Sequence, residues 1–282
     1  MTTRAINLEA SAPETKEGYV KTQFEDRLLA AEDIAEQVGR FATGQAKRRT
    51  SLTVSAKGPQ DFVSTADIDA ERMARQLIAE RFPNDAILGE EAGGELADSC
   101  WIIDPIDGTT NFLSGLPLWS VSIAYVQDGV PVVGALALPM MGDLVAAASG
   151  SGVRRNRRPL APVQRSGPKL AGIGRNLPWL AEGYRDTERL LEAAGYSLVS
   201  LGSCATELAF VALGSLEGYV QHQVSIWDIA AGVIVCREAG LLVDVTPGPT
   251  AKVNVIAGSA DFGRTLGLLP DCQTNIARKI PV

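Results

Sequence analysis

The segment from Trp101 to Asn111, with the sequence WIIDPIDGTTN, constrains the fold and the chemistry of this chain more than any other stretch. Its first three residues form a short apolar run that predicts a buried strand, and the run stops at Asp104. Pro105 removes a backbone donor and biases Asp104 toward an extended conformation. We therefore expect a buried strand that leads into a turn lined with oxygen atoms.

The turn after this strand combines two carboxylates with a possible anion cradle. Asp104 and Asp107 are separated by a proline turn, so both carboxylates can converge on one point. Gly108 allows the backbone to approach a ligand closely, and Thr109 and Thr110 can hold an anion, especially if a helix starts there. Hard oxygen ligands next to an anion cradle are typical of magnesium holding a phosphate. The alternative is a plain turn, because Asp-Pro and Asp-Gly pairs are common in turns.

Three further acidic residues follow the same pattern of placement at the end of an element. Asp67 lies at or just before the first turn of a helix, and Asp228 opens a helix that is otherwise almost wholly apolar. Glu90 follows a short apolar strand and a glycine. Taken singly, helix capping explains the two aspartates and a solvated turn explains the glutamate.

Composition excludes several classes of function. The chain has 282 residues, a net charge of −7 and a pI near 4.9, which disfavours a nucleic-acid partner. No apolar run approaches the ~20 residues of a membrane span, and the start lacks a signal-peptide pattern, so we expect a cytoplasmic protein. The four cysteines form no C-x-x-C pair, and the single histidine, His222, makes a histidine-based phosphoryl relay a poor candidate.

The order of predicted elements indicates an α/β protein of two lobes. Residues 1–21 are polar and non-periodic, which predicts a flexible arm. Residues 22–160 predict a metal-binding α+β lobe with two helices, an antiparallel sheet around a hairpin, and a glycine- and arginine-rich loop over 150–158. Residues 161–282 alternate strands and helices, which predicts an α/β lobe that carries substrate specificity.

Three ordered motifs carry a resemblance to a known family. They are Gly89-Glu90-Glu91, the run from Asp104 to Phe112, and Trp227-Asp228-Ile229-Ala230-Ala231-Gly232, and the run from Lys57 to Asp67 fits the spacing of bacterial members. Over about residues 22–268 the chain resembles the inositol monophosphatase family of magnesium-dependent, lithium-sensitive phosphatases. The resemblance implies a five-layer αβαβα sandwich, like that of inositol monophosphatase and fructose-1,6-bisphosphatase, and a homodimer.

The resemblance also implies roles for the acidic residues. Glu90, Asp104 and the carbonyl of Ile106 hold one magnesium ion, and Asp104, Asp107 and Asp228 hold a second. Glu90 helps to place a weaker third ion and the attacking water. Two divalent ions of this kind clamp the attacking and leaving oxygens of an in-line displacement.

The same resemblance assigns the remaining reaction groups. Asp67 pairs with Thr109 to orient water, and Gly108, Thr109 and Thr110 cradle the phosphate. Water bound to magnesium is more acidic than bulk water, so the reaction needs no histidine base.

Substrate choice is expected to lie in the second lobe. Gly202, Ser203 and Cys204 correspond to the loop that meets the ring hydroxyls in inositol phosphatases. Gln221 stands where those enzymes have an acidic residue, which weakens the case for tight inositol selectivity.

These inferences predict a Mg²⁺-dependent phosphomonoesterase that hydrolyses a small polyol phosphate, with inositol monophosphate first. Histidinol phosphate or a 3′-phosphonucleotide is the alternative substrate on the same fold. A non-catalytic, partner-binding protein that retains the fold is the alternative of another class. The intact set of carboxylates disfavours that last alternative, because a protein without activity would be free to lose them.

Overall fold

The computed structural model describes residues 23–58, 61–163, 165, 167–175, 182–248 and 252–269. The arm expected at residues 1–21 lies outside this range, as does Cys272. Among the described helices, none is long and apolar enough to cross a membrane.

Two long helices form the outer layer of the N-terminal part. Helix α1 spans Glu25–Ala46 and α2 spans Thr65–Arg81, close to the two predicted helices. The buried residues of α1 recur every three or four positions, which is the spacing of one helical face. Between the helices, a 3₁₀ turn, η1 (Arg49–Ser51), precedes the antiparallel strands β1 (Val54–Gly58) and β2 (Asp61–Ser64).

A seven-stranded sheet follows, with the strand order β3-β4-β5-β6-β7-β8-β9. Its strands are β3 (Ala86–Gly89), β4 (Cys100–Asp107), β5 (Ser120–Gln127), β6 (Val130–Leu138), β7 (Asp143–Ala148), β8 (Val153–Arg155) and β9 (Arg158–Pro159). Two expectations were wrong. The sheet is mixed, because β3 and β4 are parallel, and residues 150–158 are not a plain loop but contain β8 and the start of the β8–β9 hairpin.

The second sheet has five strands in the order β11-β10-β12-β14-β13. Strand β10 runs parallel to both of its neighbours, whereas β12, β14 and β13 pair antiparallel. The strands are β10 (Leu170–Ile173), β11 (Ser197–Val199), β12 (Gly218–Val224), β13 (Leu242–Pro247) and β14 (Val253–Gly258).

Five shorter helices complete the described chain. Helix α5 has the bounds expected from the sequence, whereas α7 was not predicted. The helix expected from residue 177 is described only from residue 182, since residues 176–181 lie outside the described range. The helices are α3 (Thr109–Ser114), α4 (Glu182–Ala193), α5 (Cys204–Leu213), α6 (Ile226–Glu238) and α7 (Ala260–Thr265).

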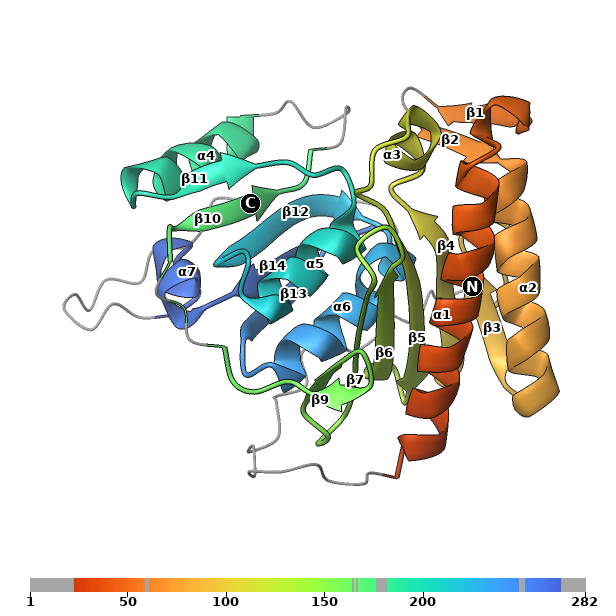
Figure 1. The fold of residues 1–282 in the computed structure, drawn as a ribbon. Helices are drawn as coiled ribbons and strands as arrows, with labels where there is room; N and C mark the ends of the chain where they lie inside the picture. Colours follow the sequence, from red (N-terminus) through yellow and green to blue (C-terminus); the bar gives the residue numbers. More distant parts are fainter. Residues whose placement is uncertain are drawn as a thin grey trace.

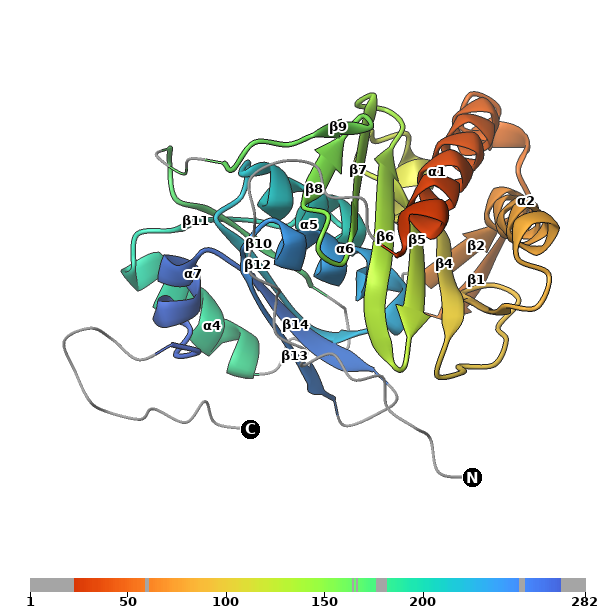
Figure 2. The same cartoon turned by 90° about the horizontal axis from the view of Figure 1, so that it is seen from below.

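These elements stack in five layers, as predicted (Figures 1 and 2). Helices α1 and α2 pack on one face of the seven-stranded sheet, and α5 and α6 pack on its other face. Helices α5 and α6 also contact the five-stranded sheet, whose far face carries α4 and α7. Because the middle helices contact both sheets, they join the two parts of the chain through one apolar layer. The division into two lobes stays a prediction.

Strand β4 shows how the sequence separates these layers. Trp101 and Ile103 join the apolar cluster under α1 and α2, whereas Cys100 and Ile102 join the cluster around α5 and α6. Side chains alternate between the faces of a strand, and both faces of this strand are covered. A continuous apolar run therefore forms a strand buried on both sides.

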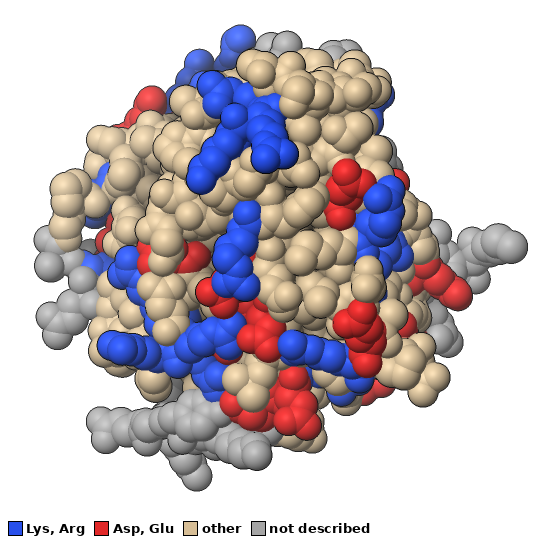
Figure 3. All heavy atoms as spheres, turned by 45° about the vertical axis from the view of Figure 1, so that its right-hand side comes forward, with Lys and Arg blue, Asp and Glu red and all other residues tan. Residues whose placement is uncertain are grey.

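Charged side chains are scattered over the solvent side of the α1–α2 layer. Figure 3 shows basic and acidic groups lying next to one another on this side of the molecule. Arg157, in the turn between β8 and β9, bonds to Asp33 at 2.8 Å and Glu36 at 3.0 Å, and Arg81 of α2 reaches Asp33 at 2.9 Å. Exposed pairs of this kind each contribute about 0–1 kcal/mol, so the network adds little beyond the packing beneath it.

Helix α6 approaches the seven-stranded sheet closely at Gly134 of β6. A Cβ atom there would lie 2.5 Å from the carbonyl oxygen of Ala231 and 2.6 Å from Cγ2 of Ile234. Glycine therefore sets the distance between the helix that carries Asp228 and the sheet that carries Asp104.

We expect Gly134→Ala to lower the free energy of unfolding by about 1–3 kcal/mol, because the added methyl group meets backbone atoms of α6. Gly44→Ala in α1 is the matched control, since a Cβ atom there would have no atom of the described chain within 4 Å. That control should raise stability by up to about 1 kcal/mol. Urea denaturation of both variants measures the effects, and equal stabilities would contradict the close approach.

Candidate active site

The two aspartates of β4 share a face of the sheet because the strand carries a bulge. Asp104 lies opposite Ser122 and Asp107 opposite Ser120, so three steps on β4 match two steps on β5. Residues two apart on β5 point to the same face, and the extra residue on β4 brings both aspartates to that face. Pro105 fits here, because a bulge leaves a residue unpaired. The strand expected to end at Asp104 thus continues to Asp107.

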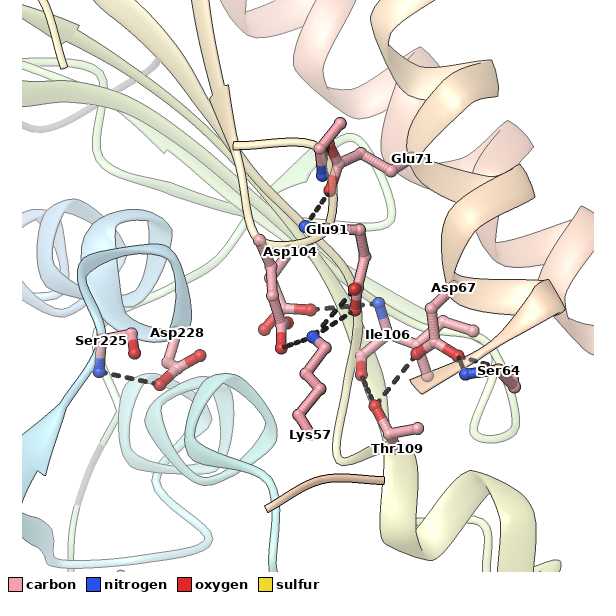
Figure 4. A network of polar contacts seen from close by, with 12 residues as sticks. Lys57, Ser64, Asp67, Glu71, Glu91, Asp104, Ile106, Thr109, Ser225 and Asp228 are labelled. Carbon is pink, nitrogen blue, oxygen red and sulfur yellow. Dashed lines mark hydrogen bonds and ion pairs between the residues drawn. The ribbon is translucent and has the colours of Figure 1, made fainter. Parts of the chain in front are cut away.

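Three carboxylates from separate elements meet beside this bulge. One oxygen each from Glu90, Asp104 and Asp228 lies within 4.8 Å of the others. Glu90 follows β3, and the parallel pairing of β3 with β4 brings the carboxyl ends of both strands to one edge. Asp228 lies in the first turn of α6, opposite β4 in Figure 4. The predicted meeting of these three acids is therefore present in the structure.

Hydrogen bonds fix the position of Asp228 against the sheet. The backbone N–H of Ser225 donates to its Oδ2 at 3.0 Å, which forms the predicted helix cap. The Ser122 hydroxyl donates to the carbonyl oxygen of Trp227 at 3.1 Å and so ties the start of α6 to β5. Capping and a ligand role are therefore compatible for this residue.

The electrostatics of the cluster favour a cation. Burial raises the pKa of Asp104 well above the usual aspartate range, and the nearby carboxylates raise it further. Burial and its acidic neighbours likewise raise the pKa of Asp228, and burial raises that of Glu90. Acids held so close together lose their repulsion when a divalent cation lies between them. The donor set, made only of carboxylate oxygens, fits magnesium.

Lys57 of β1 already brings one positive charge to this place. Its Nζ atom lies 3.0 Å from Glu90 Oε1 and 2.8 Å from Glu91 Oε2 (Figure 4). These contacts raise the pKa of Lys57 although burial opposes them. No local pattern in the sequence signals this role, because 33 residues separate Lys57 from Glu90.

The structure places Asp107 with α5 and not among the three grouped oxygens. Its Oδ2 accepts hydrogen bonds from the Ser203 hydroxyl and, at 2.8 Å, from the Ala205 N–H. Burial raises the pKa of Asp107 to about 6, and the hydrogen bonds from Ser203 and from the first turn of α5 oppose that rise. The N-terminal amides of a helix stabilise a carboxylate in this position.

Asp67 and Thr109 form the predicted pair. The Thr109 hydroxyl lies 3.0 Å from Asp67 Oδ1 and 3.1 Å from the carbonyl oxygen of Ile106. The other oxygen of Asp67 accepts from the Ser64 N–H at 2.9 Å and so caps α2. Burial raises the pKa of Asp67. One carboxylate therefore serves both as the helix cap and as the partner of Thr109.

The turn after β4 has the close backbone approach expected of an anion cradle. Gly108 has a φ of 93°, and a Cβ atom there would lie 3.0 Å from Ser203 Cβ and 3.1 Å from the carbonyl oxygen of Leu118. Helix α3 starts at Thr109, so the first N–H groups of Thr109 and Thr110 lack helical acceptors. Glycine at 108 is required both by the conformation and by the space.

The four residues expected to meet the substrate come from two elements. Gly202, Ser203 and Cys204 lead into α5, and Gln221 lies on β12, next to a bulge that ends at Val224. The Tyr219 hydroxyl donates to Gln221 Oε1. Gln221 is 7% exposed, so its side chain is largely buried.

Two further buried acids accept hydrogen bonds from loops next to this site and were not singled out from the sequence. Glu71 of α2 accepts from the N–H groups of Glu91 at 2.7 Å and Ala92 at 3.1 Å, which holds the turn that carries Glu90. Its position four residues after Asp67, on the same helical face, is a signal that could have found it. Glu207 lies in the apolar helix α5, the same pattern that drew attention to Asp228.

Comparisons with known proteins agree with this arrangement. The family model described as the inositol monophosphatase family matches residues 24–274. An inositol-1-monophosphatase of Mesorhizobium japonicum is 37% identical over 82% of this chain and 91% of its own length. A fructose-1,6-bisphosphatase/inositol-1-monophosphatase of Aquifex aeolicus is 32% identical over 73% of this chain and 80% of its own length.

A solved structure shows the same fold. The extragenic suppressor protein suhB of Bartonella henselae superposes with a TM-score of 0.77 and 31% identity, over 86% of this chain and 98% of that protein. The match in sequence and fold thus covers most of both chains. The chain therefore belongs to the inositol monophosphatase family and is a phosphomonoesterase.

Proposed function

We propose that this phosphomonoesterase is magnesium-dependent and hydrolyses a small polyol phosphate, with inositol monophosphate as the first candidate. The observation that carries the proposal is the meeting of Glu90, Asp104 and Asp228 within 4.8 Å beside the Asp67–Thr109 pair. Hard carboxylate ligands next to exposed helical N–H groups suit a magnesium ion that holds a phosphate.

The ligand sets follow from these positions. Glu90, Asp104 and the carbonyl of Ile106 would hold one ion, and Asp104, Asp107 and Asp228 a second. Glu90 would also help to hold a weaker third ion. Asp104 is common to both sets. It lies at the start of the β4 bulge and is almost fully buried.

Residues of the chain orient the attacking water and bind the phosphate group. Bound magnesium ions supply positive charge at the phosphoryl oxygens and make water a stronger nucleophile. The Thr109 hydroxyl has one proton and two acceptors beside it, Asp67 and the Ile106 carbonyl. Its proton goes to one of these acceptors, and its oxygen lone pairs remain able to accept a hydrogen bond from a water and orient it. The N–H groups of Gly108, Thr109 and Thr110 face the negative charge of the phosphate.

The names of the relatives and the residues of the second lobe both bear on the substrate. The relatives are named for inositol monophosphate or for both this ester and fructose 1,6-bisphosphate. Gln221 offers hydrogen bonds to ring hydroxyls without a charge, and Ser203 and Cys204 lie at the loop expected to meet them. A phosphate-release screen with magnesium should include inositol monophosphates, fructose bisphosphate, histidinol phosphate and a 3′-phosphonucleotide. Release from none of them would remove the proposal.

We further propose that the enzyme acts in the cytoplasm. We also propose that it is a homodimer and that lithium inhibits it, as the family resemblance implies. Light scattering tests the assembly, and a lithium titration at fixed magnesium tests the inhibition. The alternative of a non-catalytic binding protein loses its support, because the chain retains the carboxylate cluster and the family is enzymatic.

Asp104→Asn should lower phosphatase activity by at least about a hundredfold and leave the fold intact, because an amide in both ligand sets weakens charge stabilisation by several kcal/mol. Phosphate release and circular dichroism measure the two effects. Asp143→Asn is the control, since Asp143 lies at the start of β7 and bonds to Arg155 and Asn156 of the β8–β9 hairpin. Retained turnover in Asp104→Asn, or a wild-type rate unchanged by a chelator, would contradict the assignment.

Stability should depend on pH in a way that magnesium changes. The pKa values of Asp104, Asp107 and Asp228 are raised in the folded protein, that of Asp107 to about 6. Above about pH 4 the unfolded chain has released protons that the folded protein still binds, so the free energy of unfolding without metal falls as the pH rises through 6. Magnesium favours the ionised carboxylates and should oppose this loss.

Denaturation in EDTA and in excess magnesium, at about pH 5 and about pH 8, measures this linkage. The stabilisation by magnesium should be larger at the higher pH. Equal stabilisation at both values would show that the ion does not bind these carboxylates.

Gln221→Glu should change substrate preference and leave the reaction at phosphorus unchanged. A carboxylate accepts hydrogen bonds from ring hydroxyls more strongly than an amide, which is worth roughly tenfold in kcat/KM. The ratio of kcat/KM for inositol monophosphate to that for phenyl phosphate, an ester without ring hydroxyls, should rise by about this factor. Equal changes for both esters would place Gln221 outside the substrate pocket.

A further inference from the structure

The backbone of Leu201 is held from two sides. The side-chain N–H of Asn111, in α3, donates to the carbonyl oxygen of Leu201 at 2.7 Å. On the other side, the Leu201 N–H donates to Glu207 Oε1 at 2.9 Å. A loop between a strand and a helix is thereby fixed by one side chain from each part of the molecule.

Asn111 is itself well fixed. The same Nδ2 atom donates to the carbonyl oxygen of Leu118 at 2.6 Å, and the residue is 9% exposed. Gly202 has a φ of 75°, and a Cβ atom there would lie 3.1 Å from Asn111 Nδ2. The loop can lie this close to Asn111 only because position 202 is glycine.

The carboxyl group of Glu207 occupies a buried space that is open because residue 172 is glycine. It is 1% exposed, and a Cβ atom at Gly172 of β10 would lie 2.2 Å from its Oε2. That oxygen has no hydrogen-bond partner in the described part of the chain, so the buried group is costly to keep. Burial raises the pKa of Glu207 to about 8. Burying this acid in an otherwise apolar helix costs free energy. Its presence is therefore better explained by its hydrogen bond to the loop than by a contribution to stability.

The loop held in this way places the groups that bind Asp107. Ser203 follows Gly202 directly, and its hydroxyl donates to Asp107 and lies 2.6 Å from Thr206 Oγ1. The Ala205 N–H, in the first turn of α5, donates to the same oxygen of Asp107 at 2.8 Å. A shift of the loop would move both donors at once.

We propose that Asn111 and Glu207 are positioning residues that hold the backbone of Leu201, and through Ser203 and the first turn of α5 set the position of the Asp107 carboxylate. The inference rests on the proposed function, in which Asp107 binds magnesium. Neither residue needs to touch the metal or the substrate.

The test uses magnesium binding to the full chain, measured by calorimetry without substrate, together with kcat and KM for inositol monophosphate. The variants are Asn111→Ala, Glu207→Ala, the double variant, and Glu207→Gln, which keeps an oxygen acceptor for the Leu201 N–H. Glu238→Ala is the matched control. Glu238 is also a buried acid that accepts two backbone N–H groups, those of Gly150 and Gly152, but lies ~15 Å along α6 from Asp228.

Each single alanine variant in this pair should bind magnesium about tenfold more weakly, as is usual when a residue that orients a ligand is removed. The double variant should bind magnesium little more weakly than the single variant with the larger loss, because both side chains hold the backbone of one residue. Glu207→Gln should bind within about twofold of wild type. Glu238→Ala should lose stability but keep wild-type magnesium binding.

Wild-type magnesium binding in Glu207→Ala, or equal losses in Glu207→Gln and Glu207→Ala, would overturn the inference. So would strictly additive losses in the double variant. If Glu207→Ala does not fold, Asn111→Ala decides alone by the same criterion. A wild-type protein that binds magnesium but hydrolyses no phosphate ester would remove the proposed function, and the calorimetric comparison would still decide the role of Asn111 and Glu207.

Discussion

The repulsion between carboxylates buried in one place is the interaction on which the rest of this structure depends. Asp104 lies on a strand, Glu90 in the turn after another strand and Asp228 in a helix, and burial raises the pKa of each. Such a group is unfavourable unless a cation neutralises it or the packing around it holds it together. The apolar layers on both sides of the seven-stranded sheet provide that packing, and Lys57 provides part of the positive charge.

The sheets and the helices packed on them position the acidic side chains accurately and also stabilise the fold. A bulge in β4 turns Asp104 and Asp107 to one face, the parallel pairing of β3 brings Glu90 to the same edge, and Gly134 lets α6 lie close enough to bring Asp228. Each device is a local backbone feature with a defined geometry. Side chains on such rigid elements can be placed more accurately than side chains on free loops.

Much of the fold and of the site was predictable from local pattern. The apolar runs of β4 to β6 and the apolar stripe of α1 predicted these elements. Placement at the ends of predicted elements drew attention to Asp67, Glu90, Asp104 and Asp228. The contribution of Lys57 was not predictable in this way, since it depends on the path of β1 in space. The parallel pairing of β3 and the attachment of Asp107 to α5 likewise depend on contacts between distant segments, which periodicity does not encode.

The same buried acids explain why capping and catalysis need not be opposed. Asp67 and Asp228 each cap a helix with one oxygen, and Asp107 accepts from the first turn of α5. A carboxylate has two oxygens and about four acceptor sites, so one oxygen can fix the side chain while the other faces the reaction. A helix N-terminus also lowers the cost of keeping the acid ionised. The starts of α2, α5 and α6 each bind one of these acids, which is a physical way to gather negative charge where a cation must bind.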